Sequence, residues 1–108
     1  MGQIGIGLIG AGAIADLHAA AINQLDSAKL VGIWDINRET TKTKASWYHC
    51  QSFDAAQDLC GNPAVDAILV LTPMEFHCEY VIMAAKAGKH VLVEKPVAST
   101  IGEIQEML

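Results

Sequence analysis

The chain has 108 residues, which is enough for about one domain. Hydrophobic residues make up 52% and charged residues 18%, so a charge-dominated disordered chain is excluded. Seven basic and twelve acidic residues give a net charge of −5, without the basic footprint expected of a nucleic-acid-binding protein.

The first half of the chain alternates between strand and helix patterns. Residues 4–8 alternate apolar side chains with glycine and predict a strand, and a second strand is expected over residues 29–35. Between them a helix is predicted from apolar residues at helical spacing: Ile14, Leu17, Ala21 and Leu25. Asn37 is the expected N-cap of a helix over residues 38–48. A short strand is expected within residues 50–53, and Asp54 is the candidate N-cap of a short helix that ends before Gly61.

The second half repeats the alternation. Residues 67–71 form a nearly continuous apolar run, typical of a strand buried on both faces, and residues 90–93 predict a fifth strand. The helix between them has Gly88 as its expected C′ residue. Its buried face is predicted from Phe76, Tyr80, Met83, Ala84 and Ala87. This order of elements predicts an α/β fold with a doubly wound parallel sheet.

Thr100 and Glu103 form a capping-box pattern for one more helix, and the chain ends about two turns later. We therefore expect residues 1–108 to form one domain of a longer protein, with its last helix truncated. No membrane span is expected, because the apolar stretch over residues 4–15 is too short to cross a bilayer. The same stretch is a poor signal peptide, because no basic residue precedes it.

The junction after the first strand carries a GxGxxA motif. The motif comprises Gly10, Ala11, Gly12, Ala13, Ile14 and Ala15. In such a motif the first glycine permits a tight turn, the second lets a pyrophosphate approach the backbone, and the small third residue permits close helix–strand packing. The following helix N-terminus offers unpaired N–H groups to an anion. The motif alone is weak, since glycine-rich turns also occur without a ligand.

Asp35, 20 residues after Ala15, strengthens this interpretation. An acidic residue at the end of the second strand can accept hydrogen bonds from both hydroxyls of an adenosine ribose, and would repel a 2′-phosphate. The sequence therefore favours NAD as cofactor. Arg38 lies close enough in sequence to leave NADP open. The alternative is that Asp35 is simply a solvated turn residue.

The segment from Leu71 to Ala98 resembles the Gfo/Idh/MocA family of oxidoreductases. The matching parts are Thr72-Pro73 followed by His77, then AGKHV over residues 87–91, then EKP over residues 94–96. With the glycine motif and Asp35, the resemblance covers nearly the whole chain. One departure is Met74, where family members commonly have asparagine, so Met74 is not included among the site residues.

The resemblance implies that this chain is the N-terminal NAD(P)-binding Rossmann domain of a two-domain enzyme whose C-terminal substrate domain is absent here. It implies that Lys95 lies beside the nicotinamide and the substrate hydroxyl as the catalytic residue, that Glu94 positions the nicotinamide end, and that Thr72, Pro73 and His77 lie along the dinucleotide. Local hydrogen bonding is the alternative role for His77, and pairing with Glu94 is the alternative for Lys95. Lys95 also follows a buried strand, at the edge where doubly wound sheets bind ligands.

The resulting hypothesis is an NAD-dependent dehydrogenase that moves hydride between the cofactor and a hydroxyl carbon of a sugar, cyclitol or related polyol. The fragment alone is expected to be inactive, and the longer protein is expected to be a homo-oligomer. One alternative is a non-catalytic dinucleotide sensor of the same superfamily, and another is a dinucleotide-binding module attached to an unrelated protein.

Three cysteines without CxxC spacing (Cys50, Cys60 and Cys78) favour reduced thiols in a cytoplasmic protein over disulfides or a metal site. Three aromatic residues, Trp34, Trp47 and Tyr48, are expected in the core or at a domain interface. The lysines at positions 42 and 44 are expected on a solvated helix face.

Overall fold

The computed structural model describes residues 3–72 and 74–93, without the side chains of residues 74, 75 and 77. The elements in chain order are β1 (Ile4–Ile9), α1 (Ala13–Asn23), β2 (Ala28–Trp34), α2 (Arg38–Tyr48), β3 (Gln51–Ser52), α3 (Ala56–Cys60), β4 (Ala67–Val70), α4 (Met74–Lys86) and β5 (His90–Val93). Each predicted strand and helix within the described ranges is therefore present. The expected helix after Thr100 lies outside them.

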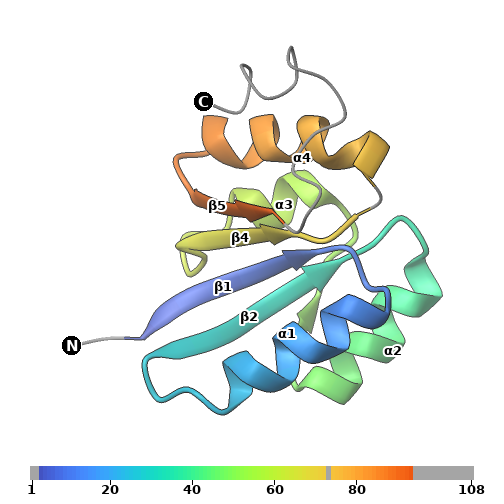
Figure 1. Cartoon of the computed structure of the whole chain (residues 1–108), viewed down its shortest axis with the longest axis vertical. Coiled ribbons are helices and arrows are strands. Elements are labelled where there is room, and N and C mark those ends of the chain that lie inside the picture. The colour runs from blue at the N-terminus through green and yellow to red at the C-terminus, as the bar shows by residue number, and fades with distance from the viewer. Residues whose placement is uncertain (1–2, 73, 94–108) are drawn as a thin grey trace.

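The strands form one sheet with the order β3-β2-β1-β4-β5, and every neighbouring pair is parallel. The chain winds outward from β1 to β3 and then returns to add β4 and β5 on the other side of β1, as Figure 1 shows. The predicted doubly wound sheet is confirmed. Its winding direction reverses between β1 and β4, the position where such sheets form a ligand crevice at the carboxyl ends of their strands.

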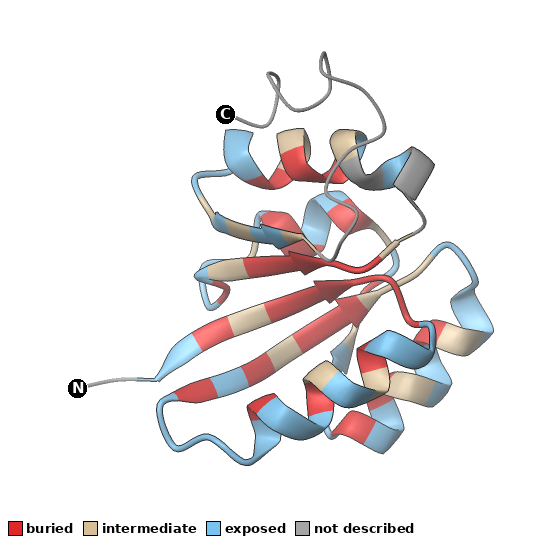
Figure 2. Cartoon of the chain, in the orientation of Figure 1, coloured by how far each residue is buried: buried red, intermediate tan, exposed pale blue. Residues whose placement is uncertain are grey.

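Two helical layers cover the sheet (Figure 1). Helices α1 and α2 pack on one face around a core that includes Leu8 and Ile33, while α3 and α4 cover the other face around Ile68 and Val70. Buried residues accordingly run along β1, β2 and β4, with exposed residues on the outer faces of the helices (Figure 2). This burial stabilises the fold mainly through removal of apolar surface from water.

Two of the predicted helix ends are confirmed. The side chain of Asn37 accepts a hydrogen bond from the Thr40 amide at the start of α2. Gly88 has φ +79, and bonds from the amides of Gly88 and Lys89 to the last turn of α4 close a Schellman motif. The prediction that Asp54 caps α3 is wrong. The N-cap is Ala55, without a side-chain hydrogen bond, because α3 begins one residue later than a cap at Asp54 requires.

The apolar residues whose spacing predicted α1 do not form its buried face. Leu17 is 69% exposed and Leu25 53% exposed, and Ile14 and Ala21 are exposed as well. The sheet is contacted instead by small side chains and one isoleucine: Ala15, Ala19 and Ile22. α1 carries apolar residues on two faces, and the alanine face lets the helix approach the sheet more closely.

The predicted α4 face is confirmed only in part. Tyr80 and Ala84 are buried there, Phe76 and Ala87 are exposed, and Val81, which the prediction omitted, is buried. The buried residues lie between positions 80 and 84, whereas Phe76 lies in the first turn of α4 and Ala87 follows its last residue.

The prediction for Lys44 is also corrected, because Lys44 is not on a fully solvated face. Its ammonium lies 2.7 Å from the Asp16 carboxylate on α1, and the Tyr48 hydroxyl donates to the same carboxylate oxygen. These contacts join α1 to α2. Of the predicted packing aromatics, Tyr48 is buried, whereas Trp47 is 63% exposed with Lys44 4.8 Å from its ring centre.

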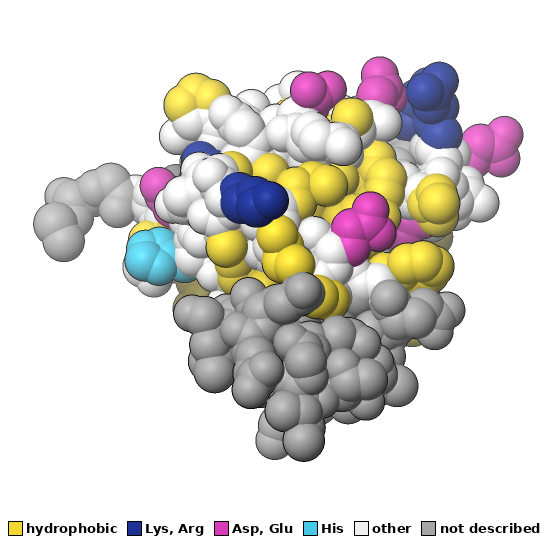
Figure 3. All heavy atoms as spheres, turned by 90° about the horizontal axis from the view of Figure 1, so that it is seen from above, with side chains coloured by type: hydrophobic (Ala, Val, Ile, Leu, Met, Phe, Trp, Pro, Cys, Tyr) yellow, Lys and Arg dark blue, Asp and Glu magenta, His cyan; other side chains and the backbone are white. Residues whose placement is uncertain are grey.

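The helices of the described residues are too short or too polar to cross a membrane: within residues 3–72 and 74–93, none is long and apolar enough. The same ranges hold no group of three metal-ligating side chains. Seen from the α4 side, charged side chains of both signs lie scattered around hydrophobic ones, as Figure 3 shows.

Candidate functional site

The turn between β1 and α1 lies at the carboxyl end of the central strand and depends on Gly10. This residue has φ +110, a conformation that L side chains rarely adopt. A Cβ here would lie 2.8 Å from the carbonyl carbon of Leu71, so the turn packs directly on the chain after β4. The Gly10 amide donates to the Trp34 carbonyl at 2.8 Å, which ties the turn to β2.

Gly12 has a different role, because it borders open space. It is the N-cap of α1, with φ −77 and no side-chain hydrogen bond. A Cβ at Gly12 would meet no atom within 4 Å, so the packing of the described residues does not require glycine here. The open approach to the N-terminus of α1 matches the space that a pyrophosphate needs beside the backbone.

A groove of about 540 Å³ opens over this turn. It is formed at the carboxyl ends of β1, β2 and β4 and by the start of α4. The lining residues are Gly10, Ala11, Gly12, Trp34, Asp35, Ile36, Leu71, Thr72, Phe76 and Tyr80. The groove therefore lies where the winding of the sheet reverses, the position predicted for a ligand.

Asp35 is held in this groove by two backbone amides. Its Oδ2 accepts a hydrogen bond from the Ala11 amide at 2.8 Å, and its Oδ1 accepts one from the Asn37 amide at 2.9 Å. An ionised carboxylate has about four acceptor positions, so each oxygen retains capacity for a ligand hydroxyl. Asp35 is thus fixed against the glycine turn and is not a freely solvated turn residue.

Thr72 gives an independent sign of a ligand. Its Oγ1 is buried and has no hydrogen-bond partner among the described residues, and the residue lines the groove. Buried hydroxyl groups are normally hydrogen-bonded, and an unpaired one costs about 1–3 kcal/mol. A polar ligand in the groove would supply the missing partner.

Aromatic and apolar side chains form the rest of the wall. The rings of Trp34 and Tyr80 lie 5.4 Å apart at 56°, Ile36 is 86% exposed, and Phe76 is 43% exposed. Burial raises the pKa of Tyr80, and the carboxylates of Glu79 and Asp35 raise it further, so the phenol keeps its proton at neutral pH. These surfaces suit a planar base.

Sequence reasoning missed this wall. Tyr80 was expected only as part of a buried helix stripe and Trp34 only as packing, and Ile36 was not considered. The available signal was the position of Trp34 and Ile36 on either side of Asp35, since residues that flank a strand end lie at the same edge of the sheet.

The structure brings together five of the predicted site residues, which are Gly10, Ala11, Gly12, Asp35 and Thr72. Three others do not line the groove. Ala13 and Ile14 are exposed in the first turn of α1, and Arg38 is exposed at the start of α2. The remaining predicted residues, Pro73, Glu94 and Lys95, lie outside the described residues, as does the side chain of His77 in α4.

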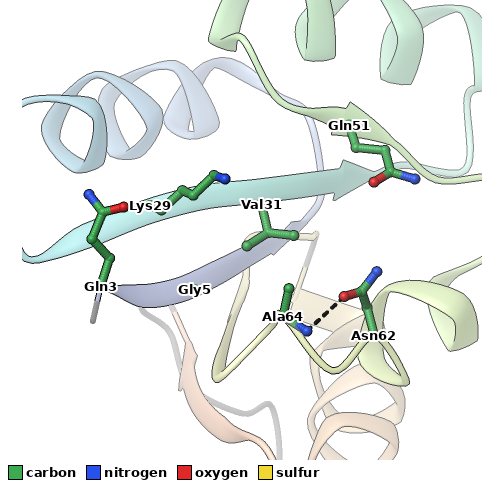
Figure 4. Close-up of a pocket in the computed structure, with 7 residues that line it drawn as sticks. All are labelled: Gln3, Gly5, Lys29, Val31, Gln51, Asn62 and Ala64. Carbon is green, nitrogen blue, oxygen red and sulfur yellow. Dashed lines mark hydrogen bonds between the residues drawn. The ribbon is translucent and has the colours of Figure 1, made fainter. Parts of the chain in front are cut away.

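A second hollow, of about 400 Å³, lies at the opposite edge of the sheet (Figure 4). Gln3, Lys29 and Gln51 lie around it near the beginnings of strands, and the Asn62 side chain accepts a hydrogen bond from the Ala64 amide at 2.8 Å. It has neither a helix N-terminus with open approach nor an unpaired buried hydroxyl among the described residues, so the groove at the carboxyl edge is the stronger candidate site.

The parallel sheet, its reversal beside β1 and the glycine turn at that point define this domain as a dinucleotide-binding Rossmann fold. A family model described as "Oxidoreductase family, NAD-binding Rossmann fold" matches residues 4–108. The chain therefore belongs to the Gfo/Idh/MocA family of oxidoreductases, as the sequence resemblance predicted.

Named relatives agree with this assignment. The chain is 36% identical over 102 residues to glucose-6-phosphate 3-dehydrogenase of Bacillus subtilis, covering 94% of this chain and 29% of the relative. It is 33% identical over 104 residues to myo-inositol 2-dehydrogenase of Thermotoga maritima, covering 95% of this chain and 31% of the relative. The chain thus spans about a third of the length of these relatives.

A solved structure is similar over the same region. The WlbA dehydrogenase of Bordetella pertussis, in complex with NADH and UDP-GlcNAcA, matches with a TM-score of 0.91 and 34% identity. The match covers 97% of this chain and 32% of the WlbA chain.

Proposed function

We propose that this chain binds NAD in the groove at the carboxyl edge of its sheet and is the cofactor domain of a dehydrogenase. The observation that carries the proposal is the position of Asp35. Its carboxylate is fixed by the Ala11 and Asn37 amides at the place where an adenosine ribose would lie, with acceptor capacity left for both ribose hydroxyls.

The other contacts follow from the same geometry. The pyrophosphate would lie over Gly12 at the N-terminus of α1, where the open space and the helix dipole favour an anion. The adenine would lie between the Ile36 side chain and the side chains of Phe76 and Tyr80. Thr72 Oγ1 would find its hydrogen-bond partner on the dinucleotide.

The same carboxylate favours NAD over NADP. A 2′-phosphate at the ribose would bring negative charge next to Asp35, in a groove partly shielded from water. Arg38 is exposed three residues away and could still pair with such a phosphate, so NADP use stays open.

The cofactor, when bound, supplies the hydride chemistry at the nicotinamide. The chain's own part is to bind and orient it. From the family resemblance, Lys95 is proposed to hold or transfer the proton of the substrate hydroxyl and Glu94 to position the nicotinamide end, with Pro73 and His77 along the dinucleotide. These roles are predictions, because the side chains lie outside the described residues.

The substrate class proposed is a secondary alcohol of a sugar, cyclitol or related polyol. Relatives named as glucose-6-phosphate and myo-inositol dehydrogenases support this class, and they favour a catalytic protein over a non-catalytic sensor. A C-terminal substrate domain, a homo-oligomer and a cytoplasmic setting belong to the same proposal. Cys50 and Cys60 form no disulfide, which fits a reducing compartment.

Titration of the chain with NADH and NADPH tests the proposal. The wild type should bind NADH more tightly, and Asp35→Ser should narrow the affinity ratio about 10-fold or more, the loss expected for hydrogen bonds to a charged group. Asp26→Ser is the matched control, since it removes one exposed carboxylate at the other edge of the sheet. A folded chain that binds neither dinucleotide at millimolar concentration, or an unchanged ratio in Asp35→Ser, would contradict the proposal.

A further inference from the structure

Thr41 is a buried polar residue without an assigned role. It lies in the second turn of α2 and is only 2% exposed. Its Oγ1 accepts a hydrogen bond from the Asp35 amide at 2.9 Å. The same oxygen lies 3.0 Å from the Asp35 carbonyl and 2.9 Å from the Asn37 carbonyl.

These contacts exceed what a threonine in a helix ordinarily makes. A bond from a threonine hydroxyl to the carbonyl four residues earlier, here Asn37, is common inside helices. The bond with the Asp35 amide is different, because Asp35 lies six residues earlier and before α2. A hydroxyl has one proton and two lone pairs, so Thr41 accepts from Asp35 and donates its proton to one of the two carbonyls.

The backbone that Thr41 holds is the backbone that aims the Asp35 carboxylate. Oδ1 accepts from the Asn37 amide within the same turn, and Oδ2 reaches the Ala11 amide in the glycine turn. A continuous set of hydrogen bonds therefore runs from α2 through Asp35 to the loop after β1. Small displacements of the Asp35 backbone would move its carboxylate away from Ala11.

We propose that Thr41 is a positioning residue that fixes the Asp35 carboxylate against the glycine turn and thereby sets the preference for NAD over NADP. The second part of this inference rests on the proposed function. Without the Thr41 hydroxyl the Asp35 amide lacks its acceptor, the turn relaxes, and the carboxylate no longer occupies one fixed place beside the ribose.

Four variants separate this role from simple support of the fold. Thr41→Val keeps the shape and removes the hydroxyl, whereas Thr41→Ser keeps the hydroxyl. Thr43→Val makes the same chemical change at an exposed position of α2. Ala45→Gly destabilises α2 at a buried position that forms none of these hydrogen bonds with Asp35.

The first measurement needs no cofactor. Amide hydrogen exchange of Ala11 is compared with that of the amides inside β1. In Thr41→Val the Ala11 amide should exchange about 10-fold faster or more relative to the β1 amides, because its bond to the Asp35 carboxylate weakens. Thr41→Ser should behave as the wild type. In Ala45→Gly any increase should be shared by Ala11 and β1, as expected from a general loss of stability.

The second measurement is the ratio of NADH to NADPH affinity. Thr41→Val should narrow this affinity ratio about 10-fold, whereas Thr41→Ser should retain the wild-type ratio. The controls Thr43→Val and Ala45→Gly should leave the ratio unchanged. Unchanged exchange at Ala11 in Thr41→Val overturns the positioning role, and an unchanged ratio overturns the role in cofactor choice. If the wild type binds neither dinucleotide, the proposed function fails, while the exchange result still decides whether Thr41 holds Asp35. Should Thr41→Val not fold, Thr41→Cys replaces it, because its thiol is only a weak hydrogen-bonding group.

Discussion

Alanine substitutions at the two glycines of the turn, Gly10 and Gly12, should have different effects: one on the stability of the fold and the other on cofactor binding. At Gly10 the added Cβ would lie 2.8 Å from the Leu71 carbonyl carbon, and the backbone has φ +110. At Gly12 the Cβ would meet nothing within 4 Å, and φ is −77. Gly10→Ala should therefore destabilise the fold, and Gly12→Ala should mainly obstruct the ligand.

The magnitudes separate the two variants. A non-glycine residue in such a backbone conformation costs about 1–3 kcal/mol, and overpacking adds about 1–3 kcal/mol. Gly10→Ala should thus lower the free energy of unfolding by about 2–6 kcal/mol, and Tm by about 10 °C or more for a domain of this size. Gly12→Ala loses only a favourable N-cap residue, about 1 kcal/mol.

Cofactor affinity should follow a different order. If the pyrophosphate lies over the turn, a methyl group at Gly12 would disrupt one or two hydrogen bonds to a charged group, so NADH affinity should fall about 10- to 100-fold. Gly88→Ala is the control. It also places alanine at positive φ (+79), where a Cβ would meet nothing within 4 Å, but at the far end of α4. It should lose about 1 kcal/mol of stability and no NADH affinity.

Urea denaturation and NADH fluorescence titration measure both quantities on the same preparations. Two results would refute the reasoning. If Gly12→Ala unfolds as easily as Gly10→Ala, the space beside Gly12 is not open. If Gly12→Ala is stable and binds NADH like the wild type, the pyrophosphate does not lie over this turn.

Three further predictions concern ionisable groups. Hydrogen bonds from Lys44 and Tyr48 lower the pKa of Asp16. These bonds therefore stabilise the fold above the unfolded pKa of 3.8, and their contribution is lost as the pH falls through the lower folded value. In urea denaturation, the stability difference between wild type and Asp16→Asn should shrink below about pH 4. Burial, followed by the hydrogen bond to Asp16, raises the pKa of Tyr48. The contribution of Tyr48 to stability is therefore fully present below the unfolded value of 10.0 and is lost as the pH rises through the raised folded value. Tyr48→Phe should lack this alkaline decline, and an identical decline in both proteins would argue against it. Burial raises the pKa of the Cys50 thiol from 9.0 to about 11; at pH 8 its alkylation, followed by peptide mass spectrometry, should be about 100-fold slower than that of a free cysteine, and equal rates would contradict the shift.

Most of the fold could be predicted from local patterns. The strand over residues 90–93 and the helix over residues 38–48 have the predicted bounds. Caps at Asn37 and Gly88 mark helix ends by chemistry that acts within a few residues. The glycine motif and the acid at position 35 likewise depend on short spacings, so they can be recognised without tertiary information.

Other features depended on contacts between distant segments. The sequence cannot tell which of two apolar faces of α1 is buried, because that choice follows from how closely Ala15 and Ala19 let the helix approach the sheet. Nor does the local pattern show that Trp34 and Tyr80, which are 46 positions apart in the sequence, contact each other in the wall of the groove.

By itself, the sequence determined the order of strands and helices, the sharp turn at Gly10 and the acid at position 35. Only the tertiary structure decided that Asp35 bonds to the Ala11 amide and that Thr41 supports it from α2. The physical reason is that the parallel strands bring their carboxyl ends to one edge of the sheet, where segments far apart in the chain become hydrogen-bonding neighbours.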